Sequence, residues 1–272
     1  MSVAGTREPA YAKLNLLLHV GAPRADGLHP ICSSVASIDL ADDVQLGPSE
    51  TDEDRVECPG VDGPNLAEAA LAAFRQRVPA LPRIAVRIVK RIPVAAGLGG
   101  GSADAAAVLR AANRMAGDAL DPDALREIAA GLGSDVPSQV EPRHALVQGT
   151  GEIVEPLELP RLGAVLVTQD HGLSTAAVYE QLDRSGGWRA ELDPDRVRAL
   201  DAGVLENDLQ PAALALRPEL GAVLDRLRDA GARGALVSGS GPTCFGLFRH
   251  GPEADAAAAA IPGALSVRLR EP

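Results

Sequence analysis

The chain reads PVAAGLGGGSAD from Pro93 to Asp104. Before this stretch, residues 84–90 alternate apolar and polar side chains as a β-strand does, and after it residues 103–115 have a strongly helical composition. A strand therefore delivers a run of glycines to a helix N-terminus. There, free backbone N–H groups converge, the helix dipole favours an anion, and missing Cβ atoms let phosphate oxygens approach the main chain. We expect a phosphate-binding loop.

Two familiar phosphate loops do not match this stretch. A P-loop requires a Lys before its final Ser or Thr, and no Lys follows these glycines. A dinucleotide-binding fingerprint requires GxGxxG, but counting from Gly97 the last position holds Ser102. The simpler alternative is a glycine-rich turn without a ligand. Four glycines in the five positions from Gly97 to Gly101, followed by a Ser that opens a helix, favour phosphate binding.

The composition excludes several classes of protein. The 272 residues carry 26 Lys or Arg and 37 Asp or Glu, a formal net charge of −11, which argues against a basic face for nucleic acid or anionic membranes. The N-terminal segment MSVAGTREPA has no apolar core, and no apolar run approaches the roughly 18 residues that span a bilayer. We expect a compact globular protein in the cytoplasm.

Two residue types are scarce enough to be informative. Lys13 and Lys90 are the only lysines, all other cations being Arg, so a chemical role is expected for each. The three cysteines, Cys32, Cys58 and Cys244, are too scattered for a disulfide framework or a zinc site, and none lies in a CxxC pair. We interpret them as small packing residues.

The order of the expected elements predicts two α+β domains, residues 1–157 and 158–272, because strands are grouped rather than strictly alternating with helices. In the first domain we expect strands at 11–20, 34–40 and 84–90, and helices at 65–78, 103–115 and from Asp121 to Gly133. In the second we expect strands at 164–168, 234–238, 243–248 and 265–269, and helices at 175–182, between 211 and 228, and in the Ala-rich stretch before the last strand.

The glycine loop resembles the second signature of the GHMP small-molecule kinases, Pro-x-x-x-Gly-Leu-Gly followed by small residues and Ser. The resemblance extends over nearly the whole chain, because four further stretches match that family in order and spacing: Ala12-Lys13-Leu14-Asn15-Leu16, Asp26-Gly27-Leu28-His29, Leu132-Gly133-Ser134-Asp135-Val136-Pro137 and Ser238-Gly239-Ser240-Gly241-Pro242-Thr243-Cys244. The resemblance implies a two-domain GHMP kinase fold whose C-terminal domain is ferredoxin-like.

The additional glycines are similar to those of the GHMP kinases that phosphorylate a tertiary hydroxyl of a diphosphocytidyl sugar alcohol, with ATP and magnesium. By this resemblance Asp135 is the catalytic base and Lys13 its partner. A nearby ammonium favours the carboxylate form of an Asp and stabilises a developing alkoxide or a γ-phosphate oxygen. From residue type alone, Asp135 as a loop cap and Lys13 as an exposed strand residue are equally acceptable interpretations.

The resemblance also implies which residues hold ATP. They are Pro93, Val94, Ala95, Ala96, Gly97, Leu98, Gly99, Gly100, Gly101, Ser102 and Ala103 of the loop, with Asn65 and Lys90 in the nucleotide pocket. The magnesium ion is expected near Ser102. The alternative is that Asn65 is simply a helix cap and Lys90 an exposed strand residue.

For the second substrate, the matching positions are Asn15, Leu28, His29, Thr175, Tyr179, Gly239 and Gly241. His29 is expected to hydrogen-bond the cytosine. The family normally encloses the cytosine between two aromatic rings, and here Leu28 departs from that pattern while Tyr179 keeps it. A stack on Tyr179 alone loses part of the roughly 0.5–1.5 kcal/mol of an aromatic pair.

Three other functions stay open from the sequence. One is a GHMP kinase for a different alcohol, such as homoserine or mevalonate; another is a nucleotide-binding homologue without catalysis, although such a protein needs no base. A third, a Rossmann oxidoreductase, would bind NAD. We expect small-molecule ligands, no nucleic acid or membrane partner, and a monomer or homodimer.

Overall fold

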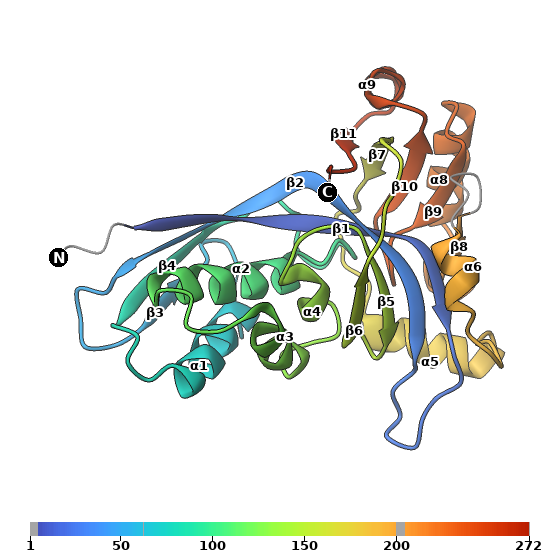
Figure 1. The fold of residues 1–272 in the computed structure, drawn as a ribbon. Helices are drawn as coiled ribbons and strands as arrows, with labels where there is room; N and C mark the ends of the chain where they lie inside the picture. Colours follow the sequence, from blue (N-terminus) through green and yellow to red (C-terminus); the bar gives the residue numbers. More distant parts are fainter. Residues whose placement is uncertain (1–4, 62, 200–204, 272) are drawn as a thin grey trace. The chain divides into compact units, whose positions relative to one another are not determined.

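The computed structural model describes residues 5–61, 63–199 and 205–271 (Figure 1). Residues 1–4 of the N-terminal segment discussed above lie outside the described residues. The chain forms two compact units, each assembled from separated stretches of sequence. The first unit comprises Met1–Ala12, Leu40–Val94 and Gly99–Pro142, and the second comprises Lys13–Asp39, Ala95–Leu98 and Arg143–Pro272. The glycine loop is therefore divided, because its residues 95–98 belong to the second unit and its helix to the first.

Eleven strands and nine helices are found in the described ranges. The strands are β1 (Thr6–Val20), β2 (Ile31–Pro48), β3 (Arg55–Glu57), β4 (Ile84–Val89), β5 (Ala145–Gly149), β6 (Ile153–Pro156), β7 (Gly163–Val167), β8 (Glu206–Asn207), β9 (Gly234–Val237), β10 (Cys244–Phe248) and β11 (Ala264–Arg268). The helices are α1 (Leu66–Arg77), α2 (Gly100–Met115), α3 (Pro122–Ala130), α4 (Val136–Gln139), α5 (Thr175–Ser185), α6 (Pro194–Arg198), α7 (Gln210–Leu216), α8 (Leu220–Asp229) and α9 (Gly251–Ala260).

The first unit packs helices against one side of a sheet (Figure 1). Strand β4 pairs antiparallel with the end of β2 and parallel with β3, and β1 lies on the other side of β2. Apolar side chains of β2 and β4, including Val44, Ile84 and Ile88, meet Phe74 of α1 in the core. The buried stretch of α2 is rich in Ala, whose small side chain lets helix α2 pack closely against its neighbours.

The second unit contains a four-stranded antiparallel sheet with the strand order β11-β7-β10-β9. Helices α8 and α9 bury Leu224, Leu227 and Ala254 with the sheet residues Val165 and Phe248. In the same unit β8 pairs parallel with the end of β1, and the start of β2 pairs antiparallel with β5, which pairs with β6. This mixture of grouped strands and helices confirms the predicted α+β class.

Most predicted elements are present, with shifted ends. The helix expected to start at Ala103 begins at Gly100, because the N–H of Ala103 already bonds back to the carbonyl of Gly99, which makes Gly99 the N-cap. The helix predicted to run to Gly133 ends at Ala130, where Gly131 bonds back to the carbonyl of Ile128. Strands β5 and β6, of five and four residues, were not predicted from the sequence.

In the described residues no helix is both long and apolar enough to cross a membrane. The domain boundary between residues 157 and 158 stays a prediction. The two units interleave along the chain because β1 and β2 are long strands that pass from one unit into the other.

Candidate functional site

In the second unit, the first part of the glycine loop is held between β1 and the turn that follows β9. The backbone N–H of Lys13 donates to the carbonyl of Leu98 at 3.0 Å, and the N–H of Thr243 donates to the carbonyl of Ala96 at 3.3 Å. The hydroxyl of Ser238 donates to the carbonyl of Gly97 at 3.0 Å. Residues 95–98 therefore have a fixed backbone that joins the first and third sequence motifs.

Gly97 is required by this packing. Its φ is +76°, a left-handed backbone that L side chains rarely adopt. A Cβ at this position would lie 2.4 Å from the carbonyl oxygen of Ser238 and 2.7 Å from that of Gly241. Any side chain on Gly97 would thus displace backbone rather than another side chain.

In the first unit, the loop continues into the N-terminus of α2. The N–H of Ala103 donates to the carbonyl of Gly99 at 2.9 Å, which closes the first helical turn. The N–H groups of Gly100, Gly101 and Ser102 precede that turn, so helix geometry supplies them with no i−4 carbonyl. Gly99, the capping residue, has no side chain to accept from them. This arrangement has the donors and the dipole that bind a phosphate.

Lys90 lies beside this helix start. A Cβ on Gly100 would be 3.3 Å from the Lys90 Nζ atom. The Nζ atom donates to Oδ2 of Asp42 at 2.5 Å and to Oδ2 of Asp104 at 2.6 Å. The second oxygen of Asp42 accepts from the backbone N–H groups of Arg91 and Ile92. Lys90 is therefore a mostly buried, doubly paired cation, and the exposed-strand interpretation of it is wrong.

Charge and burial compete in this cluster of Asp42, Lys90 and Asp104. Burial by itself lowers the pKa of Lys90, but the carboxylates of Asp104 and Asp42 outweigh it and raise that pKa above the ordinary value. Burial raises the pKa of Asp104 to about 7, against the opposing effect of the Lys90 ammonium. One oxygen of Asp104, Oδ1, is buried without a hydrogen-bond partner in the part of the chain that the structure describes.

Sequence reasoning missed the roles of Asp42 and Asp104. Asp104 did leave a signal, because it is the single charged residue in an otherwise apolar buried stretch of α2. Asp42 left none, since it lies 48 positions from Lys90 in the sequence.

Asn65 is the N-cap of α1, as the helix-cap interpretation of this residue predicts. Its Oδ1 atom accepts from the N–H of Ala67 at 2.9 Å. Asn65 lies near the Cys58 thiol, whose pKa is raised mainly by burial and also by the Asp104 carboxylate, while the Asn65 side chain acts to lower it. Capping uses only the amide oxygen as acceptor, so this geometry is compatible with the predicted contact to a nucleotide.

Lys13 and Asn15 begin a buried polar chain in the second unit. Nζ of Lys13 donates to Oδ1 of Asn15 at 2.7 Å, and Nδ2 of Asn15 donates to the hydroxyl of Ser33 at 2.9 Å. That hydroxyl donates to the carbonyl of Leu17 at 2.7 Å. The exposed-strand interpretation of Lys13 is thus wrong, and Ser33 is a positioning contact that the sequence did not reveal.

The third motif lies against this polar chain. A Cβ on Gly239 would be 3.3 Å from Oδ1 of Asn15 and 3.5 Å from Nζ of Lys13. The hydroxyl of Thr175, at the start of α5, is 2.9 Å from the hydroxyl of Ser240. The structure therefore brings together four of the residues predicted for substrate binding or catalysis, Lys13, Asn15, Thr175 and Gly239.

His29 and Tyr179 form a second group in the same unit. Their ring centroids are 5.3 Å apart with an interplanar angle of 41°. Nδ1 of the buried His29 is 2.7 Å from the carbonyl of Gly21, so this nitrogen carries a proton, and Nε2 is 3.2 Å from a carboxylate oxygen of Asp183. Leu28, in contrast, is 55% exposed.

Asp135 stands in the first unit, at the N-cap position of α4. Its carboxylate makes no capping hydrogen bond to that helix, while its backbone carbonyl accepts from the Ser138 hydroxyl at 2.9 Å. The interpretation of Asp135 as a loop cap, like its assignment as the catalytic base, stays a prediction. The pairing of Asp135 with Lys13 stays a prediction.

These features agree with known families. Residues 65–141 match the family described as GHMP kinases N terminal domain, and residues 190–266 match the family described as GHMP kinases C terminal. Homoserine kinase from Cytophaga hutchinsonii shares the fold at a TM-score of 0.70 with 18% identity, covering 98% of this chain and 94% of that one. Fold and site together define a small-molecule kinase of the GHMP class.

Particular relatives narrow the class. A 4-diphosphocytidyl-2-C-methyl-D-erythritol kinase from Geobacter metallireducens is 41% identical over 93% of this chain and 92% of its own length, and one from Thermobifida fusca is 41% identical over 92% and 89%. A crystal structure of 4-(cytidine 5'-diphospho)-2C-methyl-D-erythritol kinase superimposes with a TM-score of 0.85 at 34% identity, covering 98% of this chain and all of that one. The chain belongs to the 4-diphosphocytidyl-2-C-methyl-D-erythritol kinase family.

Proposed function

We propose that this kinase transfers the γ-phosphoryl group of ATP to the 2-hydroxyl of 4-diphosphocytidyl-2-C-methyl-D-erythritol, giving the 2-phosphate and ADP. This is a step of the methylerythritol phosphate route to isoprenoid precursors. One observation carries the proposal beyond family membership: Lys13 and Asn15 lie against the third-motif glycine Gly239, and the backbone of Lys13 is bonded to the fixed start of the phosphate loop. The cytoplasm is the proposed location, and the oligomeric state, monomer or homodimer, stays a prediction.

ATP is proposed to bind with its phosphates at the N-terminus of α2. The N–H groups of Gly100, Gly101 and Ser102 supply donors there, and the ammonium of Lys90 lies beside Gly100. Asn65 and Lys90 are proposed to line the nucleotide pocket. The two lysines of the chain, Lys13 and Lys90, thus serve different parts of the reaction.

The first turn of α2 also suits a magnesium ion that arrives with ATP. The Ser102 hydroxyl is a hard oxygen ligand at the helix start, and magnesium in kinases is held by a few such oxygens together with the phosphates. When bound, magnesium neutralises charge on the β- and γ-phosphates.

The chemistry requires a base and a cation, because a tertiary alcohol is a hindered and weak nucleophile. Asp135 is proposed to accept the proton of the 2-hydroxyl as its oxygen bonds to the γ-phosphorus. The bond between that phosphorus and the oxygen shared with the β-phosphate breaks, and ADP leaves. Lys13, oriented by Asn15 at 2.7 Å, is proposed to stabilise the negative charge that develops on the transferring group.

The cytidine end of the substrate is assigned to the group around His29. Tyr179 is proposed to stack on the cytosine, with aliphatic contact from Leu28, and His29 to hydrogen-bond the base. In the structure Nδ1 of His29 already donates to the carbonyl of Gly21, and this bond holds the ring in one orientation. That leaves the Nε2 side of the ring, beside Asp183, for recognition.

The test is a substrate comparison with purified protein, ATP and magnesium, following ADP formation. We expect turnover with the diphosphocytidyl substrate and none with homoserine or mevalonate. Turnover of either of the latter, with none of the former, would overturn the proposed specificity. Asp135→Asn should bind ATP almost normally and lose about 10²–10⁴-fold in kcat, the range of general-base catalysis. Unchanged kcat in that variant would show that Asp135 is not the base.

A further inference from the structure

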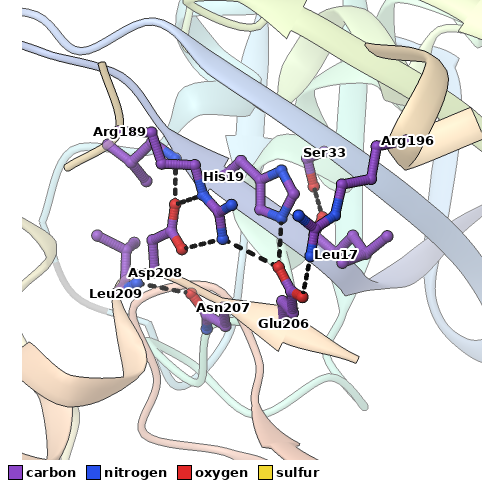
Figure 2. A network of polar contacts seen from close by, with 10 residues as sticks. Leu17, His19, Ser33, Arg189, Arg196, Glu206, Asn207, Asp208 and Leu209 are labelled. Carbon is purple, nitrogen blue, oxygen red and sulfur yellow. Dashed lines mark hydrogen bonds and ion pairs between the residues drawn. The ribbon is translucent and has the colours of Figure 1, made fainter. Parts of the chain in front are cut away.

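The segment Glu206–Asp208 presents alternate side chains to opposite sides. Strand β8 pairs with Leu17 and Leu18 of β1, and successive side chains of a strand point in opposite directions. Figure 2 shows Glu206 and Asp208 bonded to Arg189, while the amide of Asn207 between them is directed away from that arginine. The two acidic residues and Asn207 therefore have different partners.

We name the set His19, Arg189, Arg196, Glu206 and Asp208 the arginine clamp. Arg189 donates to both carboxylate oxygens of Asp208, at 2.7 and 2.8 Å, and to Glu206 at 2.9 Å. His19 is 2.8 Å from Glu206, which also accepts from Arg196 at 2.5 Å. Burial alone raises the pKa of Glu206, but the bond from His19 and the charges of Arg196 and Arg189 outweigh it and lower that pKa. The clamp fixes the backbone on both sides of Asn207.

The buried amide of Asn207 holds two pieces of backbone together. Its Nδ2 donates to the carbonyls of Val237 and Gly239, each at 2.8 Å, and its Oδ1 accepts from the N–H of Leu209 at 2.9 Å. Both amide hydrogens are thus used on the end of β9 and the turn of the third motif.

The carbonyl of Gly239 matters because this residue lies against Lys13 and Asn15. A trans peptide is planar, with its C=O and N–H pointing in opposite directions. When the Gly239 carbonyl points to Asn207, the N–H of Ser240 in the same peptide therefore points away from it. The bond from Asn207 sets the orientation of the one peptide that follows Gly239.

We infer that Asn207 is a positioning residue for phosphoryl transfer: it orients the Gly239–Ser240 peptide beside Lys13, and the arginine clamp holds Asn207 in place. This inference deepens the proposed function and rests on it. Asn207 acts through the turn and not on the substrate. Removing its donors should therefore disturb the reaction step more than the binding of ATP at the N-terminus of α2.

The test uses Asn207→Asp with Asn113→Asp as its matched control. The first variant keeps the size of the side chain but places a carboxylate oxygen against two carbonyls. Asn113 is also a buried amide, with Nδ2 donating to the carbonyl of Leu120 at 2.8 Å and Oδ1 accepting its N–H at 2.9 Å, but it ties the end of α2. For both variants we would measure melting temperature, kcat, and KM for each substrate.

We expect Asn207→Asp to lower kcat by about 10- to 100-fold, the equivalent of one or two net hydrogen bonds, with KM for ATP within about threefold of the parent. Asn113→Asp should lower the melting temperature by a comparable amount but keep kcat within about twofold of the parent. Equal kcat in the two variants, or a loss confined to melting temperature, would overturn the inference.

Arg189→Lys keeps the test decisive if Asn207→Asp does not fold. A lysine cannot reproduce the fork that joins Asp208 and Glu206, so the segment loosens while Asn207 stays intact. We expect a smaller fall in kcat, about threefold to tenfold, again with little change in KM for ATP. Unchanged kcat in this variant would refute the role of the arginine clamp in holding Asn207.

Failure of the parent protein to phosphorylate the diphosphocytidyl substrate would refute the proposed function separately. The variants would then be compared on the alcohol that the parent does phosphorylate.

Discussion

Gly97→Ala adds a single methyl group at a point where backbone atoms already stand. The new Cβ would lie 2.4 Å from the carbonyl oxygen of Ser238 and 2.7 Å from that of Gly241, and real Cβ atoms essentially never come within 3.0 Å of such atoms. Relieving that overlap by backbone shifts costs about 1–3 kcal/mol. The left-handed φ of +76° adds about 1–2 kcal/mol for an L side chain. The free energy of unfolding should therefore fall by about 2–5 kcal/mol.

Gly117→Ala is the matched control for this variant. Gly117 has nearly the same backbone, with φ of +74°, but a Cβ there would meet nothing within 4 Å. Only the left-handed cost of about 1–2 kcal/mol remains. Urea unfolding of both variants and the parent measures the two losses, and their difference isolates the clash with the third-motif backbone.

The catalytic readout separates the two glycines further. Because Gly97 and Ala96 are bonded to Ser238 and Thr243, a displaced loop should lower kcat/KM for ATP by about tenfold or more, equivalent to 1.4 kcal/mol. Gly117→Ala should stay within about twofold of the parent. Equal losses of stability and of kcat/KM in the two variants would refute the reasoning, since it would mean that the close approach at Gly97 has no energetic consequence.

Three further predictions test other parts of the site. Asp104 has a folded-state pKa of about 7 against an ordinary 3.8, so the folded protein binds more protons than the unfolded chain in that interval and loses stability as the pH rises through it. Asp104→Asn should remove this loss. The free energy of unfolding of parent and variant is measured against pH, and a constant difference between the two from pH 4 to pH 7 would contradict the prediction. N-ethylmaleimide should label the half-buried Cys58 faster than Cys32 and Cys244, which are buried. ATP should slow the labelling of Cys58, because this residue lies near Asn65 of the proposed nucleotide pocket. Mass spectrometry with and without ATP checks this, and a labelling rate that ATP leaves unchanged would place the nucleotide elsewhere. Tyr179→Ala should raise KM for the diphosphocytidyl substrate by about 3- to 10-fold, with KM for ATP unchanged, and steady-state kinetics showing equal changes in both would argue against a cytosine stack.

The local features of the fold were predictable because each depends on neighbouring residues. Asn65, Asp121 and Ser174 cap the helices that follow them, because a short polar side chain accepts from N–H groups two or three residues ahead. Gly97 could likewise be singled out, since its motif requires a backbone without a side chain.

The contacts between strands that position the two lysines were not predictable in the same way. Lys90 pairs with Asp42, which is distant in sequence but lies on the neighbouring strand β2, and Asn15, the partner of Lys13, bonds Ser33 of β2. Such contacts depend on the register between strands, and a shift of one residue would turn every side chain to the opposite face. Periodicity identifies a strand but does not identify its neighbour.

By itself the sequence determined the class of chemistry, phosphoryl transfer. It did so through a glycine loop that opens a helix, two lysines among cations that are otherwise arginines, and motifs whose order resembles one kinase family. Only the tertiary structure decided which partners those residues have, and it made Asn207 a support of the third motif. The physical reason is range. Caps, turns and left-handed glycines are settled within a few residues, whereas the bonds of Asn207 to Val237 and Gly239 join positions 30 and 32 residues away, which meet only when the buried faces of the second unit pack.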